Sequence, residues 1–241
     1  MFEYFLNPAN HKPGIPVDMI SYHFYAVPTP DQTPEIKQFT FFEQADRFLA
    51  TVGYIEEIRK RLSPETRTAV DEIGAFSAGD LMPGRDAGPI PDSHWSLASA
   101  IYAYVFGQLV TQGIDVANEA GFIGYPTHFA GLSLVDWNTG APNARFRVLE
   151  LLKNSVDLGA KLVNTSTDTS MIYALGFISP NGDHKLLLVN KRSHPIEVAL
   201  PEQAKKVEYV DQTTKSDPPV RRTLNDNKLT LGGYGVAVLW F

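Results

Sequence analysis

The chain contains no cysteine among its 241 residues. Disulfide bonds and thiolate metal ligands are therefore excluded, and cysteine usage gives no indication of the redox compartment. The histidines are scattered without the close spacing of metal ligands, so we expect no metal site and no cofactor. They are His11, His23, His94, His128, His184 and His194.

Long hydrophobic runs are also missing. No apolar stretch reaches the roughly 18 residues that span a membrane. The first five residues lack the basic start and apolar core of a signal peptide, so a cytoplasmic location is the default expectation. No extended basic block stands out, the pairs 205–206 and 221–222 are isolated, and the net charge is −6. We therefore expect neither a nucleic-acid nor a membrane partner.

What the sequence does contain is 44% hydrophobic residues, enough for one large domain or two modest ones. In the first part, short apolar runs alternate with segments of helical periodicity, separated by loops rich in Gly and Pro such as 77–93. Such β/α alternation predicts a parallel sheet. The expected strands cover 18–25, 66–72 and 114–119, and the expected helices cover 41–62, 93–112 and 145–153. Ser93 is the expected N-cap of the second helix, and Gly113 its C-terminal stop.

The pattern changes near residue 160, where short alternating segments separated by turn residues begin. This pattern predicts an antiparallel module, most simply a β-sandwich. We therefore expect a β/α domain at 1–158 and a sandwich domain at 159–241. The expected strands cover 171–178, 185–189, 196–200, 206–210, 228–231 and 236–241.

Three parallel strands are few for this architecture. A complete (β/α)8 barrel has eight β/α units and typically about 250 residues. An open three-stranded parallel sheet would leave its edges exposed. We therefore expect the chain to form a homo-oligomer that shields these edges.

The segment Thr66–Gly74 is the most informative stretch of the chain. Its apolar run ends in Asp71, Glu72 and Gly74, as expected for a buried strand that delivers an acid to the rim of a sheet. Glu72 is therefore the first catalytic candidate; the alternative is a helix-capping or solvated acidic pair. In a regular strand Asp71 would point to the opposite side from Glu72, as a packing or hydrogen-bonding residue.

Four segments in this order resemble clan A glycoside hydrolases, especially family 39-like proteins: 18–25, 68–74, 113–125 and 136–145. They resemble the sixth, seventh and eighth barrel strands and the entry to the last helix. The resemblance implies an α/β fold with an incomplete (β/α)8 (TIM) barrel, about three to four C-terminal units, followed by a small antiparallel β-sandwich. It also implies a retaining glycosidase for β-linked xylosyl or glucosyl units, with Glu72 as nucleophile.

The sequence departs from this family at the general acid/base. The family keeps that glutamate, preceded by asparagine, at the end of the fourth strand, a part that is absent here. Asn118-Glu119 is the right dipeptide at the end of the presumed eighth strand. Retaining enzymes hold two carboxyl groups about 5–5.5 Å apart, and neighbouring strand ends allow such spacing. Glu119 is thus a candidate acid on chemistry alone; the alternative is a solvated rim residue.

Other candidates would bind the carbohydrate substrate. His23 and Tyr25 share one strand face and could bind sugar hydroxyls or orient Glu72; the alternative is a core histidine and a half-buried tyrosine. Asn118, Trp95 and Tyr125 are further substrate-binding candidates, whereas Trp137 is expected in the core. The competing functional class is a truncated, non-catalytic fragment that binds carbohydrate or only assembles into oligomers.

Overall fold

The structure is a computed structural model that describes residues 1–29, 31–82, 84 and 86–241. Its first part is a parallel sheet in the order β1-β2-β3. These strands are β1 (Met19–Ala26), β2 (Arg67–Ala75) and β3 (Val116–Glu119). The predicted β/α alternation and parallel sheet are confirmed. Positions 83 and 85 of the expected loop 77–93 lie outside the described residues.

Two long helices, α2 (Pro34–Leu62) and α3 (Asp92–Gln112), connect the three strands. Helix α2 begins seven residues before the expected start, at a proline in the first turn, where a missing N–H costs nothing. The N-cap of α3 is Pro91 rather than Ser93, which lies inside the helix. Gly113 ends α3 at φ 78°, as expected for a glycine in the left-handed region.

The remaining helical elements are short, apart from α4 (Ala144–Ser155), whose N-cap Asn143 accepts a hydrogen bond from the Arg145 N–H. The short ones are α1 (Phe2–Phe5) and the 3-10 turns η1 (Pro8–Asn10), η2 (Gly79–Leu81) and η3 (Ala130–Leu132). Within the described residues, no helix is long and apolar enough to cross a membrane.

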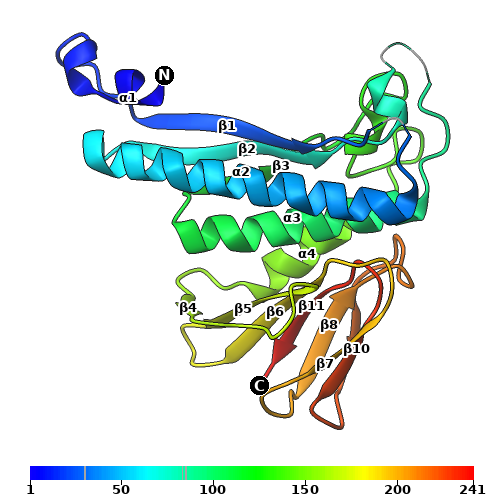
Figure 1. The fold of residues 1–241 in the computed structure, drawn as a ribbon. Coiled ribbons are helices and arrows are strands. Elements are labelled where there is room, and N and C mark those ends of the chain that lie inside the picture. Colours follow the sequence, from blue (N-terminus) through cyan, green and yellow to red (C-terminus); the bar gives the residue numbers. More distant parts are fainter. Residues whose placement is uncertain (30, 83, 85) are drawn as a thin grey trace.

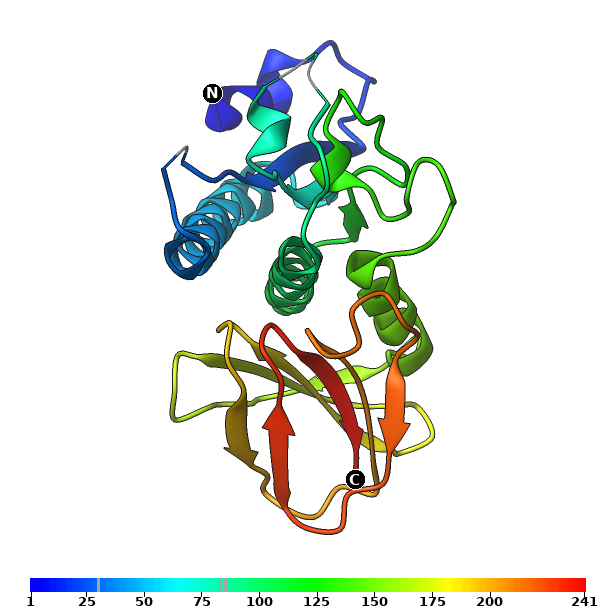
Figure 2. The ribbon, with the colours of Figure 1, turned by 90° about the vertical axis from the view of Figure 1, so that its right-hand side faces the viewer.

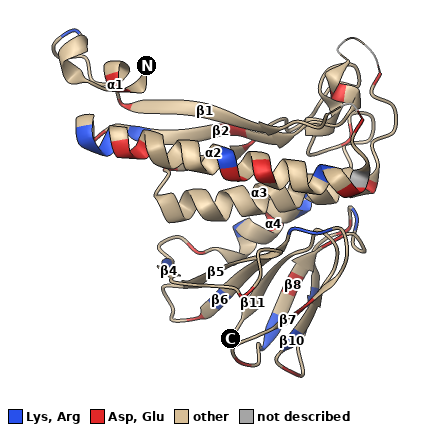
Figure 3. Cartoon of the chain, viewed as in Figure 1, with Lys and Arg blue, Asp and Glu red and all other residues tan. Residues whose placement is uncertain are grey.

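The helices α2 and α3 cover one face of the parallel sheet, and the β-sandwich lies beyond them (Figure 1). Figure 2 shows both helices almost end-on between these two layers. Helix α3 is buried on nearly all sides because it packs against both. Helix α2 has an exposed side with alternating charges, and its basic C-terminal turn complements the helix dipole (Figure 3).

The other face of the parallel sheet is open. On β1, Met19, Ser21 and His23 are exposed, whereas Ile20, Phe24 and Ala26 are buried. This alternation follows from the period of two in a β-strand, with the apolar set turned toward the helices. The open face is the one that carries Glu72.

The C-terminal part contains a six-stranded sheet in the order β4-β5-β6-β11-β8-β9 and a two-stranded sheet β10-β7. All their pairings are antiparallel, as predicted. The strands are β4 (Lys161–Val163), β5 (Ile172–Ile178), β6 (His184–Asn190), β7 (Ile196–Ala199), β8 (Lys206–Val210), β9 (Val220–Arg222), β10 (Lys228–Leu231) and β11 (Val236–Trp240). The sequence did not predict β4 and β9, which are three-residue exposed edge strands.

Strand β11 joins the two halves of the molecule. Val236 and Val238 pack toward α3 and α4, whereas Ala237 and Leu239 pack into the interior of the sandwich. The boundary expected at 158/159 lies in the loop between Ser155, the end of α4, and Lys161, the start of β4. The division into two domains stays a prediction.

Candidate active site

Strand β2 carries one extra residue relative to both of its neighbours. On β1, the consecutive residues Tyr22 and His23 pair with Val70 and Glu72. On the other side, Val70 pairs with Ala117, whereas the next register is Ile73 with Glu119. The extra residue therefore lies within the Asp71–Glu72 pair, which forms a β-bulge.

The bulge turns two consecutive carboxylates toward the same histidine. His23 Nε2 lies 3.3 Å from Asp71 Oδ1, and His23 Nδ1 lies 3.3 Å from Glu72 Oε2. The expectation that Asp71 points away from Glu72 is wrong because the strand is not regular at this point. The side chains of Asp71 and Glu72 are 40% and 43% exposed, so both reach solvent on the open face.

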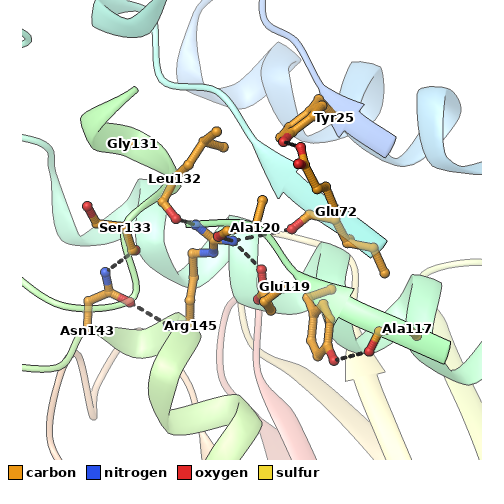
Figure 4. A network of polar contacts seen from close by, with 12 residues as sticks. Tyr25, Glu72, Ala117, Glu119, Ala120, Gly131, Leu132, Ser133, Asn143 and Arg145 are labelled. Atoms are coloured by element: carbon orange, nitrogen blue, oxygen red, sulfur yellow. Dashed lines mark hydrogen bonds and ion pairs between the residues drawn. The ribbon is translucent and has the colours of Figure 1, made fainter. Parts of the chain in front are cut away.

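Tyr25 holds the same oxygen of Glu72. Its hydroxyl donates a hydrogen bond to Glu72 Oε2 (Figure 4). Burial, followed by the hydrogen bond to Glu72, raises the pKa of Tyr25, so the phenol keeps its proton. The ring stacks on Phe76 at a centroid distance of 4.9 Å. Gly74 makes room for it, since a Cβ there would lie 3.1 Å from the ring.

Glu119 does not lie with Glu72. It pairs with Ile73, whose side chain is buried on the helix side of the sheet. Figure 4 shows Glu72 extending toward Tyr25 and Glu119 extending toward Arg145. The Glu119 side chain is 2% exposed, which also contradicts the solvated-rim alternative. Burial raises the pKa of Glu119 to about 7, although the Arg145 charge acts in the opposite direction. The geometry therefore does not support Glu119 as an acid acting opposite Glu72.

Arg145 is the partner that the sequence did not reveal. Its side chain is fully buried and bonds Glu119 and the backbone carbonyl of Leu132. Its Nη2 also donates to the carbonyls of Ala120 (3.2 Å) and Ile73 (3.4 Å). Its position in the sequence could have indicated such a partner. An arginine in the first turn of a helix opposes the helix dipole, so it needs a compensating anion.

The predicted sugar-binding residues fall into two places. Asn118 is exposed and lies opposite the bulge, on the side of Glu72. Trp95 instead lines a cleft of about 420 Å³ together with Trp137 and Asp136. Tyr125 packs edge-on against Trp137 at 5.0 Å. Trp137 is 46% exposed, so the expectation that it belongs to the core is wrong.

The lining of this cleft includes neither Glu72 nor His23. His23 and Tyr25 both lie at Glu72. The alternative of a core histidine is wrong because His23 is exposed, whereas Tyr25 is half-buried, as its alternative had it. Within the described ranges, no group of three His, Asp or Glu side chains is arranged to hold a metal ion.

Solved structures with a similar fold are clan A glycoside hydrolases. The arabinofuranosidase of family GH51 from Xanthomonas axonopodis pv. citri has a TM-score of 0.65 at 13% identity, over 92% of this chain and 52% of its own. A GH30 endoxylanase from Clostridium papyrosolvens C71 has a TM-score of 0.51 at 12% identity, over 92% of this chain and 48% of its own. A β-porphyranase of family GH86 from Bacteroides plebeius has a TM-score of 0.60 at 12% identity, over 92% of this chain and 41% of its own.

These identities show a shared fold and nothing finer. The chain spans about half the length of the structures that it matches. A family model also matches residues 170–239, and it describes the C-terminal immunoglobulin-like domain of D-apionate lactonase. No curated protein matches the chain.

Proposed function

We propose that the chain carries the nucleophile of a retaining glycoside hydrolase and that Glu72 is this nucleophile. Tyr25 and His23 both contact Glu72 Oε2. The other oxygen, Oε1, is thereby left to attack the anomeric carbon from the open face. A carboxylate fixed through one oxygen is well oriented for a single attack trajectory. This arrangement is the observation that carries the proposal.

The substrate class is β-linked xylosyl or glucosyl units, in line with the resemblance to family 39-like enzymes. Asn118, exposed beside the bulge, would donate a hydrogen bond to a sugar hydroxyl. The cleft with Trp95, close to Tyr125 through Trp137, would bind a more distant sugar by ring stacking.

The general acid must approach Glu72 from the open face, at a carboxyl–carboxyl distance of about 5–5.5 Å for retention. Since Glu119 extends the other way, we propose that a segment lying over the open face brings this acid. The parallel sheet would then be part of an incomplete (β/α)8 barrel whose free edges are covered in a homo-oligomer. Light scattering should show a dimer or a larger species; a stable monomer contradicts this assembly.

Turnover tests the nucleophile directly. The purified chain should hydrolyse nitrophenyl β-xyloside or β-glucoside, because an activated leaving group needs little acid assistance. Glu72→Gln should lower kcat/KM by about 10³-fold or more, as expected for loss of a nucleophile. The control Glu65→Gln removes the same charge from an exposed position before β2 and should keep full activity. Equal activity in both variants contradicts the assignment.

A second candidate is hydrolysis of a sugar lactone, favoured by the family model that matches residues 170–239. Glu72 would then act as a general base on water, and the second carboxylate of a glycosidase would not be needed. Titration in a pH-stat separates the two activities, because opening of a lactone releases an acid and hydrolysis of a glycoside does not. Absence of both activities in the natural chain favours the remaining alternative, a non-catalytic fragment that binds carbohydrate or only assembles.

A further inference from the structure

The β-bulge of β2 creates an arrangement that a regular strand could not make. A single imidazole, His23, lies between two consecutive carboxylates, with each ring nitrogen 3.3 Å from one of them. Asp71 Oδ1 is buried, and no hydrogen-bond partner satisfies it within the described residues. His23 Nε2 is its polar neighbour at ion-pair distance. A buried carboxylate oxygen directed at one imidazole nitrogen needs a function.

We propose that Asp71 is a positioning residue for Glu72 and that it acts through His23. This inference rests on the proposed role of Glu72 as the reacting carboxylate. The Asp71 carboxylate, 3.3 Å from Nε2, favours a proton on that nitrogen and thereby fixes the ring plane and the tautomer of His23. The Nδ1 atom is then directed at Glu72 Oε2. The same logic makes a carboxylate partner fix the tautomer of a histidine in metal and hydrolase sites.

The number of protons on the His23 ring decides how the ring can interact with the two carboxylates. A carboxylate only accepts hydrogen bonds, and a neutral imidazole has a single N–H to donate. A neutral ring held by Asp71 would turn the lone pair of Nδ1 toward Glu72. A ring with two protons donates to both carboxylates. In either state of the ring, Asp71 fixes which edge of His23 faces Glu72 Oε2.

Tyr25 shares this role with His23. The Tyr25 hydroxyl donates to the same Oε2 atom, and its ring lies 6.3 Å from that of His23. The charge of Arg145 reaches Tyr25 from the helix side. Tyr25 and His23 both contact Oε2, so Oε1 is the oxygen free to react.

The test uses the full chain without ligand. Imidazole ¹⁵N spectra, with His23 assigned by His23→Gln, report which ring nitrogens carry protons. In the natural chain at pH 7, Nε2 should carry a proton and its signal should change when Asp71 is replaced. Asp71→Asn should give a mixture of His23 tautomers, whereas Glu65→Gln should leave the His23 spectrum unchanged. A His23 protonated only on Nδ1 in the natural chain overturns the proposal even if the variant fails to fold.

Kinetics give the second readout. Asp71→Asn should lower kcat by about 10- to 100-fold, the loss typical for a carboxylate that orients an active-site histidine, with little change in KM. A variant with unchanged His23 signals and unchanged kcat overturns the proposal. A separate result tests the proposed function. Unaffected turnover in Glu72→Gln would refute the assignment of Glu72 as nucleophile, and the spectra would still decide whether Asp71 fixes His23.

Discussion

Replacing Arg145 should be among the most damaging single changes to stability. Arg145→Met removes a fully buried guanidinium and leaves the Glu119 carboxylate, 2% exposed, without a cation. Glu119 Oε1 already lacks a hydrogen-bond partner within the described residues. Breaking one side of a buried ion pair typically costs about 3–5 kcal/mol. We expect the free energy of unfolding to fall by that amount.

A double-mutant cycle isolates the charge. Glu119→Gln keeps Arg145 bonded to three backbone carbonyls, so its cost should be smaller, about 1–3 kcal/mol. The double variant Arg145→Met with Glu119→Gln buries no charge and should be more stable than Arg145→Met alone. The matched control is Arg61→Met, since Arg61 pairs with Glu3 on the surface, both about 60% exposed, and should change stability by less than about 1 kcal/mol.

Urea unfolding of the four chains measures these differences. The expected order is natural chain, Glu119→Gln, double variant, Arg145→Met, from most to least stable, with the middle two close together. A loss below about 1 kcal/mol in Arg145→Met, or strictly additive losses, would refute the reasoning that Arg145 neutralises a buried carboxylate.

Further predictions concern packing and pH. Gly107→Ala should lower the free energy of unfolding by about 1–3 kcal/mol, because its Cβ would lie 2.6 Å from the Tyr173 ring. Gly53→Ala has its nearest neighbour at 3.6 Å and should raise the free energy of unfolding by about 0.5–1 kcal/mol; thermal melts measure both changes. Burial lowers the pKa of His94 from 6.5 to about 4, so stability should fall by up to about 3 kcal/mol as the pH drops between these values; unchanged acid sensitivity in His94→Gln would contradict this. The raised pKa of Glu119 acts with the opposite sign: its contribution is present below about 4.5 and is lost as the pH rises through about 7. The stability cost of Glu119→Gln should therefore shrink as the pH rises over that window, and a cost that grows would contradict it.

Much of the fold could be predicted from local patterns. The apolar positions of α2, such as Ala45, Leu49 and Val52, keep helical spacing and are buried, in line with the helix predicted from periodicity over 41–62. Gly113 ended α3 where its positive φ is needed. These features depend on neighbours within one element, so the sequence records them directly. The early start of α2 was missed because Pro34 was taken as part of a loop, although proline is well suited to the first turn of a helix.

The arrangement of the site depends on tertiary register, which local patterns do not record. The order of Asp71 and Glu72 along the chain predicted opposite faces, and the bulge reversed that outcome. Glu119 was expected near Glu72 because both end neighbouring strands. One residue of register decides which face a side chain takes, and Glu119 is turned to the helix side. Its partner Arg145 lies 26 positions later, on another element.

The central claim, that Glu72 is the nucleophile of a retaining enzyme, is tested most directly by covalent trapping. A dinitrophenyl 2-deoxy-2-fluoro-β-xyloside or -glucoside should glycosylate a carboxylate nucleophile, release dinitrophenolate and leave a stable glycosyl–enzyme ester. Mass spectrometry of the digested chain should place one fluorosugar on the peptide that contains Glu72, and Glu72→Gln should remain unlabelled. A label on another residue, or turnover of the parent glycoside with no label in the natural chain, would contradict the account.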